Sequence, residues 1–407
     1  MWEKKTVTLE WEGMQLPFHV AQELFSSHEI DQGTRLLLRS LDVSALPERP
    51  VVLDFGCGYG PLGLAIKARL PAARVVLIDR DALAVAFTEW NGRELGLSSG
   101  TDDLVAHGGL DFVSVLAPEG YDLILWNVPG KAGAEVLRGL IDDAPHALQP
   151  NGLLALVVVN PLAATMREAV DALPFLTVTL DQRYTAHTVM HLRREESGLR
   201  DWPRPLAFDR GVFDRPTIDL DWRGHPYTVR PTLGLPEYDG PDFATGLMMD
   251  SLVQLTDSVG TVRRFLGHGM GQGHAAILAA TLLTTDRTSL VERDLLALET
   301  TRRNLTANGV SRDLVRHEHA PLLDARRAGS TDADLILYRL GDQLSPARLG
   351  VEHARLLDAL ASGGTLVVSG PSTSVSRFLG VAGTVGALKQ WTRKRRSGAS
   401  VSILAPR

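Results

Sequence analysis

Glycines and one acid in the first half of the chain are spaced as they are in a nucleoside-binding turn. Gly56, Gly58 and Gly60 alternate directly after the apolar stretch 51–55. Because glycine adopts positive φ without a steric penalty, such a turn lets the backbone approach a ligand closely. Asp79 ends the next apolar stretch, where a carboxylate would accept hydrogen bonds from ribose hydroxyls. The pattern predicts a site for a ligand that contains a ribose.

Two neighbouring features refine this site. Asp54 stands two residues before Gly56, where it could hold the loop or accept a hydrogen bond from a ligand ammonium group. No lysine followed by a hydroxyl residue comes after Gly60, so a phosphate-binding loop of that kind is not expected. The alternative is that the glycines only form a turn of the fold.

A second polar group follows the apolar stretch 122–126, where Asn127 and Val128 precede Pro129. Ligands of parallel sheets bind at the carboxyl ends of the strands. An asparagine carbonyl and a backbone carbonyl at a rigid proline turn can hold an exocyclic amine and direct its lone pair. We therefore predict Asn127 and Pro129 as catalytic groups. Helix capping is the alternative role for Asn127.

The elements that position these residues form an alternating series. An apolar run that ends in a glycine turn and opens a helix, 61–70, is the first strand–turn–helix of a doubly wound sheet. A hairpin is expected over 6–20, because two alternating stretches flank a Glu-Gly turn. Further strands are expected at 74–79, 104–106, 122–126, 153–159 and, as a closing pair, 175–194, with helices at 82–95 and 134–148.

The same series begins again after about residue 217. TIDLDWRGHPYTV matches TVTLEWEGMQLPF, and ADLILYRLGDQ matches YDLILWNVPGK. We align Gly267, Gly269 and Gly271 with the three glycines of the first turn, and Glu292 with Asp79. Matches at this many ordered points predict a duplicated domain. The expected division is 1–195, a linker at 196–216 and 217–407.

The two copies differ where chemistry is expected. In this alignment Phe265 replaces Asp54, and Arg339 replaces Asn127. The second copy is therefore predicted to be degenerate, and the first to be competent. The fold class that we expect is α/β, with two tandem Rossmann-like domains.

These motifs resemble those of class I S-adenosylmethionine (SAM) methyltransferases. FSSHEIDQGTRLLL, followed by VLDFGCGYGPLGLA, resembles the methyltransferase small domain family, and within it the ribosomal RNA guanine-N2 methyltransferases. The resemblance implies that both copies are class I methyltransferase domains. It also implies that the glycine loop, Asp54 and Asp79 bind SAM, and that the catalytic N-P-P-aromatic turn falls on Asn127 to Gly130.

The chain departs from this family at the catalytic turn. Val128 replaces the first proline, and Gly130 replaces the aromatic residue that would stack on a base. Losing that platform removes about 1–3 kcal/mol of base affinity. We expect Phe25, Trp126 and Lys131 to contact the substrate instead, with packing in the core as the alternative for the two aromatic residues.

Composition limits the remaining possibilities. The chain has 407 residues, one cysteine and a net charge of −6, which fit a reducing cytoplasm and argue against broad adhesion to nucleic acid. The amino-terminal stretch has no apolar core, and no run of eighteen apolar residues occurs, so neither a secretory signal nor a membrane span is expected. No histidine or cysteine spacing indicates a metal site. The stretch 389–396, KQWTRKRR, is the densest basic cluster and would suit either an RNA backbone or a solvated hairpin.

The sequence therefore predicts a monomeric, cytoplasmic SAM-dependent methyltransferase that modifies an exocyclic amine of guanine in ribosomal or other structured RNA. Two alternatives stay open. One is methylation of a small molecule or a protein side-chain amide, which the altered turn favours. The other is a protein that binds SAM or RNA without turnover.

Overall fold

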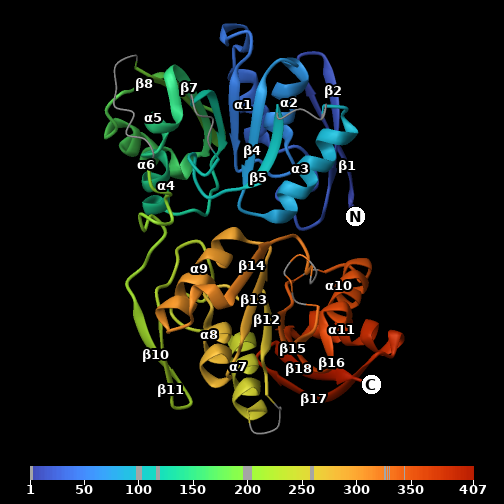
Figure 1. Cartoon of the computed structure of the whole chain (residues 1–407). Coiled ribbons are helices and arrows are strands. Elements are labelled where there is room, and N and C mark those ends of the chain that lie inside the picture. Colours follow the sequence, from blue (N-terminus) through green and yellow to red (C-terminus); the bar gives the residue numbers. More distant parts are fainter. Residues whose placement is uncertain are drawn as a thin grey trace. The chain divides into compact units, whose positions relative to one another are not determined.

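The chain folds into two compact units, Met1–Phe213 and Asp214–Arg407, each built around a seven-stranded sheet (Figure 1). The structure is a computed structural model that describes residues 3–97, 103–115, 120–195, 204–256, 261–324, 327, 329, 331–342 and 344–407. It confirms the predicted α/β class with two tandem Rossmann-like domains. No helix in these ranges is long and apolar enough to cross a membrane.

The first unit pairs its strands in the order β5-β4-β3-β6-β7-β9-β8, with a separate β1-β2 hairpin. Its first five sheet strands in this order are parallel, and β9 and β8 close the sheet antiparallel. The elements are β1 (Lys5–Trp11), β2 (Met14–Val20), α1 (Gln32–Ser40), a 3-10 helix η1 (Val43–Ala45), β3 (Val51–Phe55), α2 (Pro61–Arg69), β4 (Arg74–Asp79), α3 (Ala82–Glu94), β5 (Leu104–Gly108), β6 (Tyr121–Asn127), α4 (Ala134–Ile141), α5 (Ala144–Ala147), β7 (Leu148–Val159), α6 (Asn160–Asp171), β8 (Leu176–Arg183) and β9 (His187–Arg194).

The second unit repeats this plan with the order β14-β13-β12-β15-β16-β18-β17 and a separate β10-β11 hairpin. Its elements are β10 (Ile218–Trp222), β11 (His225–Val229), α7 (Phe243–Leu255), β12 (Arg264–His268), α8 (His274–Leu282), β13 (Arg287–Glu292), α9 (Leu295–Ala307), η2 (Arg312–Leu314), β14 (Val315–His319), β15 (Ala333–Arg339), α10 (Pro346–Ala359), β16 (Leu360–Pro371), α11 (Ser372–Val385), β17 (Leu388–Arg396) and β18 (Ala399–Pro406).

The core of the first unit explains why the sheet presents its loops at one edge. Alternate apolar residues of the strands, such as Leu77 on β4 and Leu125 on β6, face one side of the sheet. Helices α1, α2 and α3 bury their apolar residues against that side. The strand order changes direction between β3 and β6, so the carboxyl ends of β3, β4 and β6 surround the crevice where such sheets bind ligands.

The duplication extends to individual hydrogen bonds. In the first unit the Asn91 side chain accepts from His19 N at 2.8 Å and donates to His19 O at 3.1 Å and Tyr59 O at 2.9 Å. In the second unit Asn304 accepts from Arg230 N at 3.0 Å and donates to Arg230 O at 3.2 Å, and also to Gln272 O at 2.9 Å. The same amide thus ties the hairpin to the glycine loop in both copies.

The structure corrects the predicted alignment of the second glycine turn. Gly56, Gly58 and Gly60 have φ values of 72°, 58° and 94°. The matching values of 75°, 58° and 95° belong to Gly269, Gly271 and Gly273. Glycine stands at every second position of GHGMGQGH, so a shift of two residues still aligns glycine with glycine. Because β3 and β12 each end directly before this turn, Gly267, and not Phe265, stands where Asp54 stands.

Residues 204–213 pack on the first unit. Asp143 is fully buried, and its Oδ1 accepts from Arg204 Nε at 2.8 Å and from an Arg210 guanidinium nitrogen at 2.6 Å. The backbone N–H of Ala207 donates to Asp111 Oδ2. The predicted boundaries at 195 and 216 stay a prediction, and residues 196–203 of the expected linker lie outside the described residues.

Candidate functional site

The glycine loop between β3 and α2 is hydrogen-bonded to the sheet on one side and open on the other. Gly56 N and Cys57 N donate to Ile78 O at 2.8 and 3.0 Å, which anchors the loop to β4. The Thr88 hydroxyl donates to Gly58 O at 2.9 Å. A Cβ built on Gly56 or Gly58 would meet no atom within 4 Å. The backbone of the loop therefore faces free space, as a ligand-binding turn requires.

Asp79 lies at the carboxyl end of β4, beside this loop. Its Oδ2 accepts from Gly58 N at 2.9 Å, and its Oδ1 accepts from Asp81 N at 2.8 Å. The residue is half-buried. Burial raises the pKa of Asp79 to about 6, although the two N–H groups stabilise its charged form. Each carboxylate oxygen has a further lone pair, so the group can still accept from a ligand hydroxyl.

Asp54 is fully buried beneath the loop. Its Oδ2 accepts from Gly63 N, in the first turn of α2, at 2.8 Å. Its Oδ1 has no hydrogen-bond partner among the described residues. Burial raises the pKa of Asp54 to about 7, against the stabilising N–H of Gly63. These contacts support the loop-holding role of Asp54 over direct contact with a ligand ammonium group.

Asn127 ends β6, and its amide is fixed by two side chains from the start of α1. Its Nδ2 donates to Asp31 Oδ2 at 2.9 Å and to Thr34 Oγ1 at 3.3 Å. Asp31 also caps α1 by accepting from Thr34 N at 3.2 Å. An ionised carboxylate only accepts hydrogen bonds, so the NH₂ of Asn127 must face Asp31. The amide carbonyl takes no part in these two bonds, and Asn127 does not cap the next helix, which begins after Gly133.

The two residues after Asn127 continue the turn. Val128 N donates to Val157 O at 2.9 Å, so the chain stays attached to β7. Pro129 is exposed, and its carbonyl accepts from Ala132 N at 3.2 Å. The turn is thus held at both ends, and Pro129 lies at the surface.

The predicted substrate contacts divide into two exposed residues and one buried residue. Phe25, in the loop before α1, is 71% exposed, and Lys131 is also exposed. Trp126 is fully buried, with its ring tilted or edge-on against the rings of Phe55 and Phe112. This burial argues against the predicted stacking of a base on Trp126, because no face of the indole is open. The residue lies inside β6, where both faces of the sheet are covered.

The corresponding crevice of the second unit is filled. Arg339, in the place of Asn127, forms an ion pair with Asp242 at 2.5 Å and lies 3.5 Å from Glu237. A Cβ on Gly269 would lie 2.7 Å from Arg339 Cβ, whereas the equivalent Gly56 faces open space. The loop that carries Glu237 is held down because His274 bonds to Glu237 O at 3.0 Å. In the second copy Arg339 thus occupies the space beside Gly269, and Glu237 Oε2 would lie 3.8 Å from a Cβ on Gly271.

Sequence reasoning did not identify Asp31 and Thr34 as partners of Asn127. The signal was present in the duplication, since Asp242 and Thr245 occupy the same places around Arg339. A pair of residues that recurs beside two different partners indicates a structural support. In the described part of the chain, no group of three or more His, Cys, Asp or Glu side chains is placed to hold a metal ion.

Comparison with known proteins finds a family match within the first unit. The sequence model of the methyltransferase small domain family matches residues 15–183. The matched residues include the glycine loop, Asp79 and Asn127.

Curated relatives match about a third of the chain. The ribosomal RNA small subunit methyltransferase C of Pseudomonas putida (strain GB-1) is 41% identical over 138 residues, which are 33% of this chain and 39% of that protein. The Pseudomonas entomophila (strain L48) protein of the same name is 38% identical over 138 residues, with the same coverage. The chain thus spans about 39% of the length of these relatives.

A solved structure matches the whole plan of the chain. The T. thermophilus 16S rRNA N2 guanine methyltransferase (RsmC), in complex with AdoMet and guanosine, has a TM-score of 0.69 and 19% sequence identity. The match covers 99% of this chain and 98% of that chain. At this identity the likeness shows the fold alone, and it confirms two tandem Rossmann-like domains.

Proposed function

We propose that the first unit binds SAM and transfers its methyl group to an exocyclic amine of guanine in ribosomal RNA. The observation that carries the proposal is the fixed amide of Asn127. Its Nδ2 is held by Asp31 and Thr34 at the end of β6, and β6 pairs with β3, which leads into the open glycine loop. The carbonyl oxygen of an asparagine accepts hydrogen bonds, so it can hold an NH₂ group.

The residues of the crevice fit SAM. The open backbone at Gly56 and Gly58 leaves room for the adenosine, and the carboxylate of Asp79 would accept from its ribose hydroxyls. Asp54 supports the loop from beneath through Gly63. SAM supplies an electrophilic methyl group when bound. Arg339 and Glu237 fill the equivalent space of the second unit, which supports one cofactor per chain.

The chain acts on the acceptor mainly by positioning it. The Asn127 carbonyl and a backbone carbonyl of the Val128–Pro129 turn accept from the two N–H groups of the amine. The lone pair of the amine nitrogen is then directed toward the methyl group of the bound cofactor. Holding two reactants in this orientation supplies much of the rate acceleration. Asp31 and Thr34 set the orientation of the amide and do not touch the substrate.

Ribosomal RNA is proposed as substrate from the names of the relatives and from the site chemistry together. The match covers 39% of the first of these relatives, so its activity is carried to this chain as a proposal. A bacterial enzyme of this kind would act in the cytoplasm, and we propose that it acts as a monomer. Phe25 and Lys131 are exposed near the start of α1 and after the Asn127 turn, where they would contact RNA.

The departure at Gly130 favours a second candidate. With glycine in place of an aromatic ring and Trp126 buried, the described turn offers no stacking platform of its own. An acceptor without a large base, such as a small-molecule amine or a protein side-chain amide, would need none.

One labelling experiment separates these candidates. The full chain is incubated with methyl-tritiated SAM and, separately, with ribosomal RNA, ribosomal protein and metabolite fractions. We expect label in RNA, at N2 of guanine after nucleoside digestion, and none with Asn127→Ala. Label only in protein or metabolites would replace the RNA proposal by the second candidate. No label in any fraction, with SAM binding intact, would support binding without turnover.

A further inference from the structure

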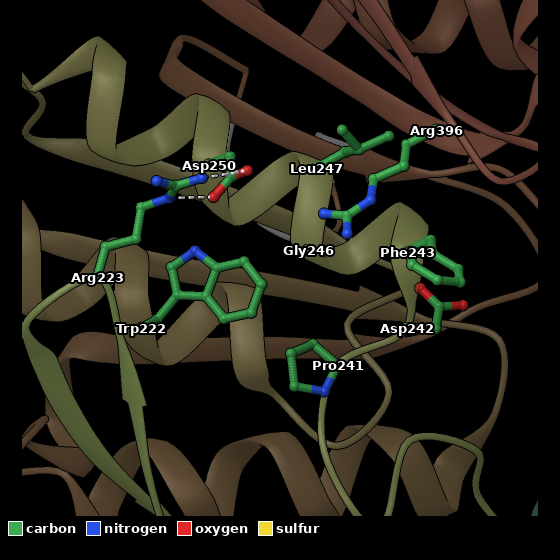
Figure 2. A pocket seen from close by; sticks show the side chains of 9 residues that line it. All are labelled: Trp222, Arg223, Pro241, Asp242, Phe243, Gly246, Leu247, Asp250 and Arg396. Carbon is green, nitrogen blue, oxygen red and sulfur yellow. Dashed lines mark hydrogen bonds and ion pairs between the residues drawn. The ribbon is translucent and has the colours of Figure 1, made fainter.

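A groove on the second unit is lined by two aromatic side chains and a cation (Figure 2). It has a volume of about 530 Å³ and lies between the β10-β11 hairpin, the first turns of α7 and the end of β17. Trp222 and Phe243 flank it in Figure 2, and Arg396 reaches into it from β17. The Arg396 guanidinium lies 5.4 Å from the centre of the Phe243 ring.

The groove exists because α7 carries a glycine in its second turn. A Cβ on Gly246 would lie 3.0 Å from Cη2 of Trp222, so the indole lies directly against the helix backbone. Glycine destabilises a helix interior relative to alanine, so its presence here needs a reason, and the close approach of the indole supplies one. In the first unit Arg35 occupies the equivalent place of α1, and Trp11 is buried. The groove is therefore a feature of the second unit.

The strand beside the groove is strongly basic. Residues 388–396 include five cations and no acid: Lys389, Arg393, Lys394, Arg395 and Arg396. Within the described ranges, neither Lys389, Arg395 nor Arg396 forms an ion pair with a carboxylate.

The two acids that line the groove are already neutralised. Asp250 pairs with Arg223 at 2.5 Å, and Asp242 pairs with Arg339 at 2.5 Å. The groove and its edge therefore carry a net positive charge that suits an anionic ligand.

Protection of a sheet edge explains only part of this pattern. β17 is the last strand of its sheet, and cations on an edge strand discourage pairing with other chains. The same argument predicts few exposed aromatic residues, yet Trp391 and Phe243 are each 53% exposed. Cations interleaved with exposed rings are the surface that single-stranded nucleic acid binds, because phosphates pair with the cations and bases stack on the rings.

We propose that the groove and strand β17 bind a single-stranded segment of the RNA substrate, with bases on Trp222 and Phe243 and phosphates along β17. This inference rests on the proposed function, which makes RNA the substrate. It assigns a binding role to the second unit, whose own crevice is filled by Arg339.

Fluorescence anisotropy of a labelled twelve-nucleotide single-stranded RNA with the full chain tests the proposal. The test variant combines Lys389→Glu, Arg395→Glu and Arg396→Glu. Its matched control combines Arg263→Glu, Arg312→Glu and Arg316→Glu, which change the same charge on exposed residues away from β17, with two of them at the opposite edge of the sheet. At about 0.1 M salt we expect the test variant to bind at least tenfold more weakly than the control.

The salt dependence and a second variant show which contacts are lost. Each lost phosphate contact reduces the slope of log K against log salt by about 0.7, so the triple variant should lose about 2. Phe243→Ala should weaken binding by about 5-fold to 150-fold without changing the slope, the loss expected for one stacked base. Leu314→Ala, at another exposed apolar residue of this unit, should leave binding unchanged.

The outcomes separate this inference from the proposed function. Equal RNA affinity of the test and control variants would overturn the proposal that RNA binds at the groove. The proposal would also be overturned if polyglutamate displaced the labelled RNA as well as unlabelled RNA does. In either case wild-type labelling of RNA would still support the methyltransferase proposal. Weaker RNA binding by the test variant than by the control, with unchanged SAM affinity, supports the proposed binding of RNA at the groove. Absence of wild-type RNA labelling overturns the proposed function instead.

Discussion

Replacing Asn127 by alanine should stop methyl transfer while leaving the cofactor bound. The substitution removes the carbonyl that would hold the acceptor and the Nδ2 donor to Asp31 at 2.9 Å. Among the described residues, neither the glycine loop nor Asp79 is hydrogen-bonded to the Asn127 side chain. SAM affinity should therefore stay within about threefold of the wild-type value.

The size of both effects follows from these contacts. Asp31 is half-buried and keeps its bond to Thr34 N, so the lost bond costs about 1 kcal/mol of folding stability. For a unit of this size that lowers Tm by about 2–4 °C. Loss of acceptor positioning, by contrast, should lower kcat by about 100-fold or more.

The assay combines tritium transfer from SAM to RNA with calorimetric titration of SAM. Arg339→Ala, at the equivalent position of the second unit, is the matched control and should change neither quantity. A kcat of Asn127→Ala within threefold of the wild-type value would contradict the proposed role of Asn127 in holding the acceptor amine. So would a loss of SAM binding that parallels the loss of turnover, because the residue would then belong to the cofactor site.

Three further changes test the site and the fold. Asp79 accepts hydrogen bonds from the ribose hydroxyls when it is ionised, and burial raises its pKa to about 6. SAM affinity, measured by calorimetry, should therefore fall as the pH drops below about 6, and Asp79→Asn should abolish this pH dependence. Asn127→Arg should fill the first crevice as Arg339 fills the second, and abolish SAM binding with a circular dichroism spectrum like that of the wild type. Asp143→Ala should cost about 3–5 kcal/mol in urea unfolding of the first unit, since Arg204 and Arg210 lose their shared buried partner; a cost below about 1 kcal/mol would contradict this.

Much of the fold was predictable because its signals are local. The apolar stretch 51–55 and the glycines after it describe a strand and a turn without reference to any other part of the chain. The hairpin at β1 and β2 follows from alternation around Glu12-Gly13 in the same way. The second unit was predictable because its sequence repeats the pattern of the first, so each of its elements has a counterpart in the first unit.

The parts that were missed depend on contacts between distant residues. Asp31 and Asn127 are 96 positions apart, and no local pattern connects a helix cap to the end of a strand. Trp126 was predicted to contact the substrate in place of the missing aromatic residue, but its burial depends on Phe112, which packs against it from another segment. The glycine register of the second unit was shifted by two because alternating glycines match themselves at that spacing, and only the backbone angles distinguish the alignments.

Calorimetric titration of the full chain with SAM shows whether the cofactor site lies in the first unit alone. We expect one SAM per chain, with binding retained in Arg339→Ala. Binding should be lost in Asp79→Ala, because the Asp79 carboxylate lies beside the open glycine loop of the first unit. Two sites per chain, or one site that survives Asp79→Ala and disappears on substitution of Arg339, would contradict it.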